Sequence, residues 1–149
     1  MAEADIRALD NGTITITVDV SVVAGNAVTQ TTKPPPIDTI LPTMTIVGSL
    51  EGDNIVNAAE DADVVVSGTT VGVEDGRTVT VVFTDASNVT VTATTTVTSN
   101  AWTLPGAEAD ISALDNGTIN ITADVSDLAG NAATQATKTI TLDNNATTI

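Results

Sequence analysis

Carboxylates are the only side chains of this sequence that are numerous enough to build a chemical site. The chain has 19 Asp and Glu residues against 4 Lys and Arg, a formal charge of −15, and neither His nor Cys. It therefore lacks a side chain that normally titrates near neutrality, a thiol nucleophile and a soft metal ligand. Hard oxygen donors instead suit Ca²⁺, which accepts about six to eight oxygens in irregular geometry. The residue types favour calcium binding over acid–base or thiol chemistry.

The same inventory excludes several classes of partner and activity. Nucleic acid and anionic membrane surfaces are bound through clusters of Lys and Arg, so we expect neither as a partner. No apolar run approaches the length of a membrane span, so direct membrane insertion is not expected. Paired carboxylates can cleave glycosides, but one Trp, one Phe and no Tyr leave a sugar little to stack on. We therefore expect no enzymatic activity.

The apolar residues are mostly Val, Ile and Ala, and 29 Thr residues accompany them, a composition typical of strands. Residues 78–84 and 89–97 alternate apolar and hydroxyl side chains, which predicts one buried and one wet face. A helical turn is expected only within 105–114, and Trp102 and Phe83 are expected in the core. The predicted strands are residues 44–47, 63–69, 78–84, 89–97, 101–104, 118–125 and 134–142. About seven short strands in about a hundred residues indicate an all-β protein, an antiparallel β-sandwich.

A near-verbatim internal repeat organises the chain. Residues 2–33 match residues 107–138 at an offset of 105, with 25 of 32 positions identical. A period of this length is that of a whole domain, so we expect an array of domains. The three prolines at 34–36 are expected to end strand pairing and to act as a semi-rigid spacer. The predicted organisation is a partial C-terminal fragment of a preceding repeat (1–33, its last two strands), a Pro-rich linker (34–42), a complete domain (43–142) and the start of the next linker (143–149).

Strand order places the carboxylates at the two ends of the predicted sandwich. We call the end where residue 43 begins the N-proximal pole and the end where residue 142 leaves the C-proximal pole. When domains stack end to end, unlike poles meet across a joint, and Ca²⁺ would turn mutual repulsion of the carboxylates into a stiff cross-link. Two plainer readings remain open, in which the acids are solvated surface and residues 127–131 form only a Gly-bearing turn. The predicted metal ligands are Asp38, Asp75 and Asp127 at the N-proximal pole and Asp53, Glu60, Asp110, Asp115 and Asp143 at the C-proximal pole.

Residues 66–81 and 114–131 carry a Gly-Thr/Glu-Asp-Gly pair, an Asp-Asn-Gly-Thr turn and an Asp-x-x-Asp-x-x-Gly-Asn segment, with a lone Trp between them. In this order they resemble the bacterial Ig-like extender repeats of large RTX-type and biofilm-associated surface adhesins. The resemblance implies non-catalytic tandem Ig-like sandwiches outside the cell, on the bacterial surface, that bind Ca²⁺ and hold an adhesive tip away from the membrane. Two positions depart from the pattern. Ile119 stands where many such repeats carry Tyr, and Val22 stands where the second copy has Asp127.

Two questions stay open at the level of sequence. The alternative function is an adhesin module that binds a carbohydrate or a protein through its pole loops. The partners expected for an extender are neighbouring identical repeats of the parent chain. The incomplete copy, residues 2–33, could also dock in a second molecule as a domain-swapped homodimer, or remain a mobile tail, because an isolated hairpin is marginal in water.

Overall fold

The computed structural model describes residues 4–26, 31–33 and 36–145. The chain divides into two compact units, Met1–Ile40 and Leu41–Ile149, called unit 1 and unit 2 below. No helix in the described part of the chain is long and apolar enough to cross a membrane.

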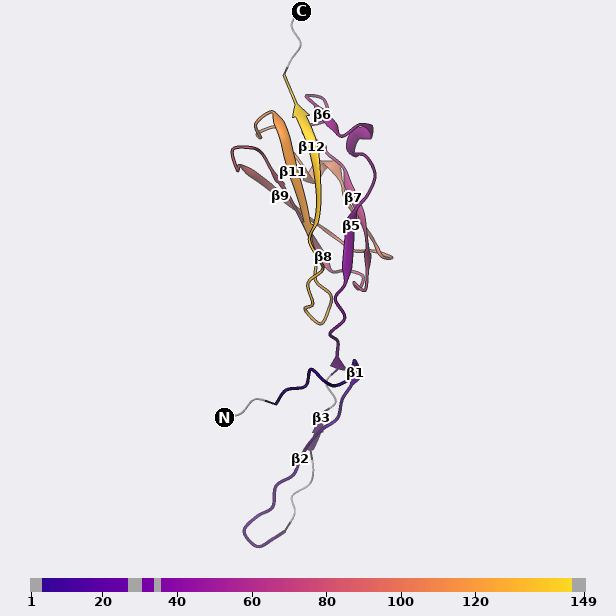
Figure 1. Cartoon of the computed structure of the whole chain (residues 1–149), viewed down its shortest axis with the longest axis vertical. Helices are drawn as coiled ribbons and strands as arrows, with labels where there is room; N and C mark the ends of the chain where they lie inside the picture. Colours follow the sequence, from indigo (N-terminus) through magenta and orange to yellow (C-terminus); the bar gives the residue numbers. More distant parts are fainter. Residues whose placement is uncertain (1–3, 27–30, 34–35, 146–149) are drawn as a thin grey trace, which may run out of the picture. The chain divides into compact units, whose positions relative to one another are not determined.

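Unit 2 is a sandwich of two β-sheets (Figure 1). The smaller sheet has the order β10 (Ala101–Leu104), β7 (Val66–Val71) and β5 (Thr43–Ile46). The larger has the order β6 (Ile55–Asn57), β12 (Ala136–Asp143), β11 (Gly117–Asp124), β8 (Thr78–Thr84) and β9 (Thr90–Thr96). Two short 3₁₀ turns, η1 (Leu50–Gly52) and η2 (Gly106–Glu108), lie in the connecting segments.

Period-two alternation places the apolar side chains between the sheets. Along β8, Val79, Val81 and Phe83 are fully buried and alternate with Thr or Val residues on the outer face. Trp102 on β10 is also buried and lies opposite Gly68 of β7 in the ladder. A Cβ atom at Gly68 would overlap the Trp102 ring and the carbonyl oxygen of Thr45. Glycine is therefore required at the point where the indole lies against β7.

The structure confirms the all-β sandwich and both expected core aromatics. One strand, β6, was not predicted. It pairs with β12 in parallel, with Ile55 opposite Thr141, whereas the other strand pairs of the described residues are antiparallel. Three residues show too little alternation to predict a strand, although Val56 at the centre of β6 is fully buried. The helical turn expected within 105–114 is reduced to η2.

Unit 1 repeats the last hairpin of unit 2. Its strands are β1 (Gly12–Thr13), β2 (Ile16–Val18), β3 (Thr31–Lys33) and β4 (Pro36–Ile37). Adding 105 to the pairs Gly12↔Ile37 and Ile16↔Lys33 gives the β11–β12 pairs Gly117↔Leu142 and Ile121↔Lys138. The offset of the sequence repeat is therefore also the offset of the strand register.

Strand pairing was expected to end at the prolines, but it includes Pro36, while residues 34–35 lie outside the described part of the chain. Pro36 lies in β4, opposite Thr13 of β1. Proline lacks a backbone donor but keeps its carbonyl acceptor and its extended φ, so it fits where a strand has an unpaired side. The paired region of unit 1 consequently extends into the predicted linker.

Candidate functional site: the two carboxylate-bearing poles

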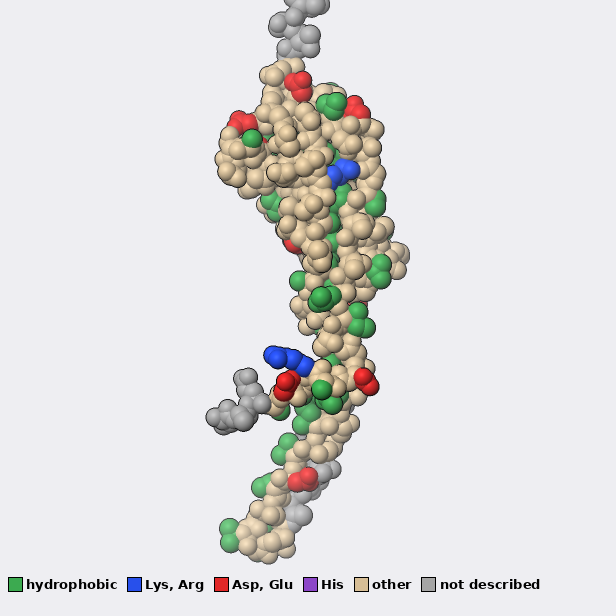
Figure 2. All heavy atoms as spheres, in the orientation of Figure 1, with side chains coloured by type: hydrophobic (Ala, Val, Ile, Leu, Met, Phe, Trp, Pro, Cys, Tyr) green, Lys and Arg blue, Asp and Glu red, His purple; other side chains and the backbone are tan. Residues whose placement is uncertain are grey.

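Strand register defines the two ends of unit 2. Thr43 at the start of β5 pairs with Val71 at the end of β7, which marks the N-proximal pole. Gly117 at the start of β11 pairs with Leu142 near the end of β12, which marks the C-proximal pole. On the face seen in Figure 2, Asp and Glu side chains gather mainly at the end of unit 2 from which the chain continues to its C-terminus.

At the C-proximal pole, the first residue after β12 is tied to two loops. The side-chain amide of Asn144 donates to Asp61 Oδ2 at 3.1 Å and to the carbonyl oxygen of Ser112 at 3.4 Å. The backbone N–H of Asn144 donates to Asn116 Oδ1 at 2.9 Å. Asp61 is only 7% exposed. Carboxylate, carbonyl and amide oxygens thus meet where the chain leaves the domain.

A pair of acidic residues, Asp85 and Asp115, lies at the same pole. Asp85 is buried, and its Oδ2 accepts the backbone N–H of Asp115 at 3.0 Å. The Ser87 hydroxyl donates to Asp115 Oδ2 at 2.6 Å. The N–H of Asp115 is the main cause that holds the pKa of Asp85 below its usual value; burial opposes it, and the N–H groups of Val89 and Ser87 add to it. Asp85 is therefore a fixed anion at neutral pH.

Three more predicted ligands lie at this pole, namely Asp110, Glu60 and Asp143. The hydroxyl and N–H of Ser112 bind Asp110 Oδ1 at 2.6 and 3.0 Å, and these bonds lower the pKa of Asp110. Glu60 Oε2 accepts the N–H of Asn57 at 3.1 Å, and Asn57 pairs with Asp143 in the β6–β12 ladder. Glu60 therefore lies in the turn that follows β6, and the last residue of β6 is paired with Asp143 at the end of β12.

Asp53 and Asp38 each close a short local turn. Asp53 Oδ1 accepts the N–H of Ile55 at 2.9 Å, and Asp38 Oδ1 accepts that of Ile40 at 3.0 Å. Asp38 belongs to unit 1. Among the described residues, no three Asp or Glu side chains lie close enough together to hold a metal ion. Within one unit the carboxylates therefore lie singly or in pairs rather than in one acidic cluster.

At the N-proximal pole, two acids of the loop between β7 and β8 bind the other loops. Glu74 Oε2 accepts the N–H of Leu128 at 2.7 Å. Asp75 Oδ1 accepts the N–H of Ser99 at 2.7 Å. Three loops that are far apart in sequence are held together here by carboxylates.

Asp127 closes the turn that precedes β12. Burial by itself would raise the pKa of Asp127, which is 1% exposed. The side-chain amide and N–H of Asn131 and the N–H groups of Gly130 and Ala129 outweigh burial and lower that pKa. The bonds from Asn131 measure 2.8 Å for the amide and 2.7 Å for the N–H. This carboxylate is ionised and largely committed to its own loop.

The matching turn of unit 1 forms without a carboxylate. The N–H of Val22 donates to the carbonyl oxygen of Asn26 at 3.1 Å, as that of Asp127 does to Asn131 at 3.0 Å. Backbone bonding at a Gly-bearing turn is therefore sufficient for this loop, and the Asp127 carboxylate is an addition to it.

Several adhesin structures are similar to this chain. A tetra-tandem repeat from the extending region of a large adhesion protein has a TM-score of 0.62 and 28% identity over 96% of this chain, which spans only 34% of that structure. A bacterial immunoglobulin-like domain of the M. primoryensis ice-binding adhesin is 30% identical, with 69% of this chain and 98% of that domain covered and a TM-score of 0.45. No protein-family model and no curated protein matches the chain.

The chain belongs to the bacterial immunoglobulin-like repeats of large adhesins. A further relative of this adhesin repeat is a Ca²⁺-stabilised adhesin that helps an Antarctic bacterium reach out and bind ice. It is 31% identical over 91% of this chain and 33% of that structure, with a TM-score of 0.49.

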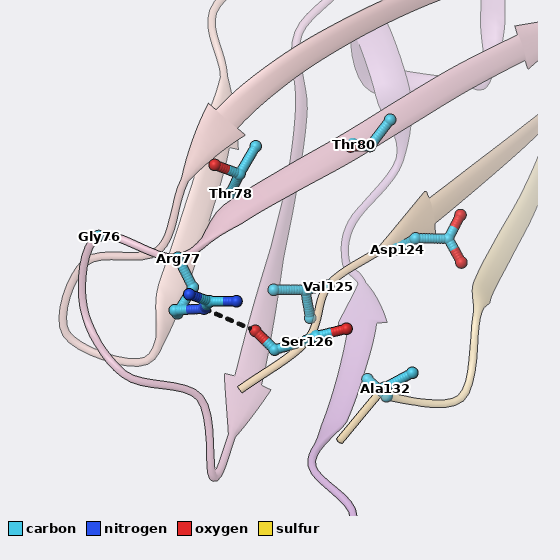
Figure 3. A pocket seen from close by; sticks show the side chains of 9 residues that line it. Gly76, Arg77, Thr78, Thr80, Asp124, Val125, Ser126 and Ala132 are labelled. Atoms are coloured by element: carbon cyan, nitrogen blue, oxygen red, sulfur yellow. Dashed lines mark hydrogen bonds between the residues drawn. The ribbon is translucent and has the colours of Figure 1, made fainter. Parts of the chain in front are cut away.

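A small pocket of about 330 Å³ lies beside the N-proximal pole of the repeat (Figure 3). Arg77 Nε donates to the carbonyl oxygen of Ser126 at 2.9 Å across it. Its lining carries no aromatic ring, and the two aromatic side chains of the whole repeat, Phe83 and Trp102, are buried. A sugar therefore finds no stacking platform on this repeat.

The structure adds residues that sequence reasoning missed. Asn144 and Asn116 contribute amide groups beside Asp61 where the chain leaves the adhesin repeat. Their signal was present in the sequence, since Asn116 belongs to the repeated Asp-Asn-Gly turn and Asn144 directly follows the predicted ligand Asp143. What the sequence could not show is that β6 brings Asp61 to the end of β12.

Proposed function

We propose that this chain is a non-catalytic extender repeat of a bacterial cell-surface adhesin, stiffened by Ca²⁺ bound by loop and linker carboxylates. The observation that carries the proposal is the repetition of both sequence and strand register at an offset of 105. Near-identical copies suit a spacer, whereas a recognition module needs distinct binding loops and is not served by repetition.

The path of the chain through unit 2 supports an elongated array. The first strand begins at the N-proximal pole with Thr43, and the last strand ends at the C-proximal pole with Asp143. Copies joined in this way add length with each repeat. The number of repeats therefore sets the reach of the adhesin.

Calcium fits the donor chemistry of the poles. Carboxylate, carbonyl and amide oxygens are available there, and the chain has no imidazole or thiolate to favour another metal. The carboxylates of one unit lie singly or in pairs. We therefore propose that the C-proximal pole of one repeat and the N-proximal pole of the next together complete the coordination shell of a Ca²⁺ ion at the joint. The proposed ligands are Asp38, Asp53, Glu60, Asp75, Asp110, Asp115, Asp127 and Asp143, to which we add Asp61.

Calcium would act here as a cross-link and not as a catalyst. Without it, like charges on facing poles repel, and with it they become ligands of one ion. The stabilisation of a related adhesin by Ca²⁺ supports this role. The setting that we propose is extracellular, on the bacterial surface, in cell adhesion and biofilm formation, with neighbouring repeats as partners and an RTX-type adhesin as the parent.

Calorimetric titration with CaCl₂ of two joined copies of residues 43–147, one repeat period each, tests the ligand assignment, because this protein contains one complete joint. The substitutions are made in the first copy, whose C-proximal pole forms that joint. We expect binding that weakens at least tenfold in Asp61→Asn and in Asp143→Asn. The matched control is Asp124→Asn, which makes the same charge change on the outer face of β11, opposite Thr80 of β8 and away from the C-proximal pole. Equal affinity in all four proteins would contradict the assignment, because the ions would then respond only to total charge.

A further inference from the structure

The β11–β12 ladder ends at Gly117↔Leu142, two residues before Asn144. Beyond the ladder, the N–H of Asn144 donates to the side-chain oxygen of Asn116 at 2.9 Å. A side chain on the turn before β11 thus takes the place of a strand partner for the residue that leads out of the domain.

Unit 1 makes the same contact at its own end. Its ladder ends at Gly12↔Ile37, and Asn11 Oδ1 accepts the N–H of Thr39 at 3.1 Å and the Thr39 hydroxyl at 2.8 Å. Asn11 and Thr39 correspond to Asn116 and Asn144 at the offset of 105. The outgoing residue differs between the copies, but the Asn and the backbone hydrogen bond are retained.

The next residue is fixed in the same way in both units. Asp38 Oδ1 accepts the N–H of Ile40 at 3.0 Å, and Asp143 Oδ1 accepts the N–H of Asn145 at 3.3 Å. Two successive backbone donors past each ladder are therefore held by side chains of the Asp-Asn-Gly turn and of the strand end.

We propose that Asn11 and Asn116 are positioning residues that fix the direction in which the chain leaves each repeat, independently of any bound ion. Each Asn precedes a glycine with positive φ, +132° at Gly12 and +123° at Gly117. Glycine adopts this conformation without strain, and it turns the chain sharply into the strand. The Asn side chain stands on that turn, where it is within reach of the departing backbone.

The contact makes the joint directional before calcium binds. Because the linker is already partly ordered, it loses less conformational entropy when an ion binds at the joint. This consequence for the array rests on the proposed extender function, whereas the positioning role is a property of one repeat and can be tested without calcium.

Amide hydrogen exchange and ¹⁵N relaxation of the full chain in EDTA test the role. Loss of one neutral hydrogen bond raises the equilibrium constant for local opening of the amide about fivefold. In Asn116→Ala we expect the Asn144 amide to exchange about fivefold faster and the order parameters of Asn144 and Asn145 to fall from about 0.85 towards 0.6. Asn116→Asp keeps the acceptor oxygen and should restore the wild-type values. Asn120→Ala on β11 is the matched control and should leave them unchanged.

Melting followed by Trp102 fluorescence shows whether unit 2 remains folded in these variants. If Asn116→Ala unfolds it, Asn11→Ala provides the second test, because Asn11 lies in unit 1 and its readout is the Thr39 amide. Unchanged exchange at Asn144 in a folded Asn116→Ala protein would overturn the proposal, as would an equal change in Asn120→Ala. A wild-type Thr39 amide that exchanges as in an unfolded chain would overturn it for the first joint.

Discussion

Ile16 and Ile121 occupy the same position of the same hairpin, 105 residues apart, yet Ile16 is 47% exposed and Ile121 is fully buried. In unit 2 the residue lies opposite Phe83 of β8 and faces the core. Unit 1 presents the hairpin without a sandwich around it in its described residues. The comparison shows that the strand register is the same in both hairpins, whereas burial of this residue requires the rest of the domain.

Matched truncations of these two residues should have very different costs. Ile121→Ala removes a buried side chain and should lower the free energy of unfolding of unit 2 by about 2–5 kcal/mol. Ile16→Ala removes an exposed one and should change it by less than about 0.5 kcal/mol. Urea denaturation followed by Trp102 fluorescence measures both, because the only Trp of the chain lies in unit 2. Equal losses would show that unit 1 is part of the same core.

Gly68→Ala should be among the most damaging single-methyl additions. The added Cβ would overlap the Thr45 carbonyl and the Trp102 ring, so the sheet or the indole must shift, at a cost of about 1–3 kcal/mol. Val71→Ala on the same strand, where Val71 is 69% exposed, is the control and should cost less than about 0.5 kcal/mol. A Gly68→Ala protein as stable as the control would mean that the indole does not lie against β7.

Lowering the pH should remove the stability that the ionised Asp85 carboxylate contributes to unit 2. The pKa of Asp85 is lower in the folded state than its usual value near 3.8, so the folded state holds the proton less tightly than the unfolded state. The stabilisation is complete above that usual value and is lost as the pH falls through the lowered pKa. Thermal melts between pH 7 and pH 2 should show this loss below about pH 4.

Asp85→Asn isolates the contribution of this carboxylate. The variant should melt several degrees lower at pH 7, because a neutral amide replaces an anion that accepts three backbone N–H groups. Its melting temperature should then fall less steeply below pH 4 than that of the wild type. Parallel pH profiles for the two proteins would assign the acid sensitivity to other groups.

The swapped dimer stays a prediction that light scattering can decide. Apolar side chains such as Val18 and Val20, each 60% exposed, are the surface that a second copy would cover. Swapping through residues 2–33 predicts a particle with twice the mass of one chain and a protected N-terminal segment. A monomer whose first 33 residues are cleaved early by protease would exclude the swap.

More of the fold than of the candidate site could be predicted from the sequence. Alternation in β8 and the turn residues around β10 placed these strands at their observed bounds, because short-range patterns determine which face is buried. The parallel strand β6 escaped prediction, since three residues between turns carry little pattern and their partner lies more than 80 residues away. The same long-range pairing brings Asp61 to Asn144, so this contact was also beyond reach of the sequence.

For the predicted metal ligands, too, only part of the arrangement could be predicted from the sequence. Their loops could be assigned to poles from strand order, and the contacts of Glu74 and Asp75 join the loops of the N-proximal pole. Their individual partners could not be predicted, because local N–H donors such as Asn131 beside Asp127 compete for each carboxylate. Their role as calcium ligands remains a prediction.

Thermal melting of the full chain in EDTA and in millimolar Ca²⁺, followed by Trp102 fluorescence, tests the central claim most directly. A ligand that binds only the folded state stabilises it by about 2.7 kcal/mol at a free concentration a hundredfold above Kd. We expect the melting temperature of unit 2 to rise by several degrees in Ca²⁺ and to return to its starting value when EDTA is added. Identical melting temperatures in the two conditions would contradict calcium stiffening and leave an extender that depends on protein contacts alone.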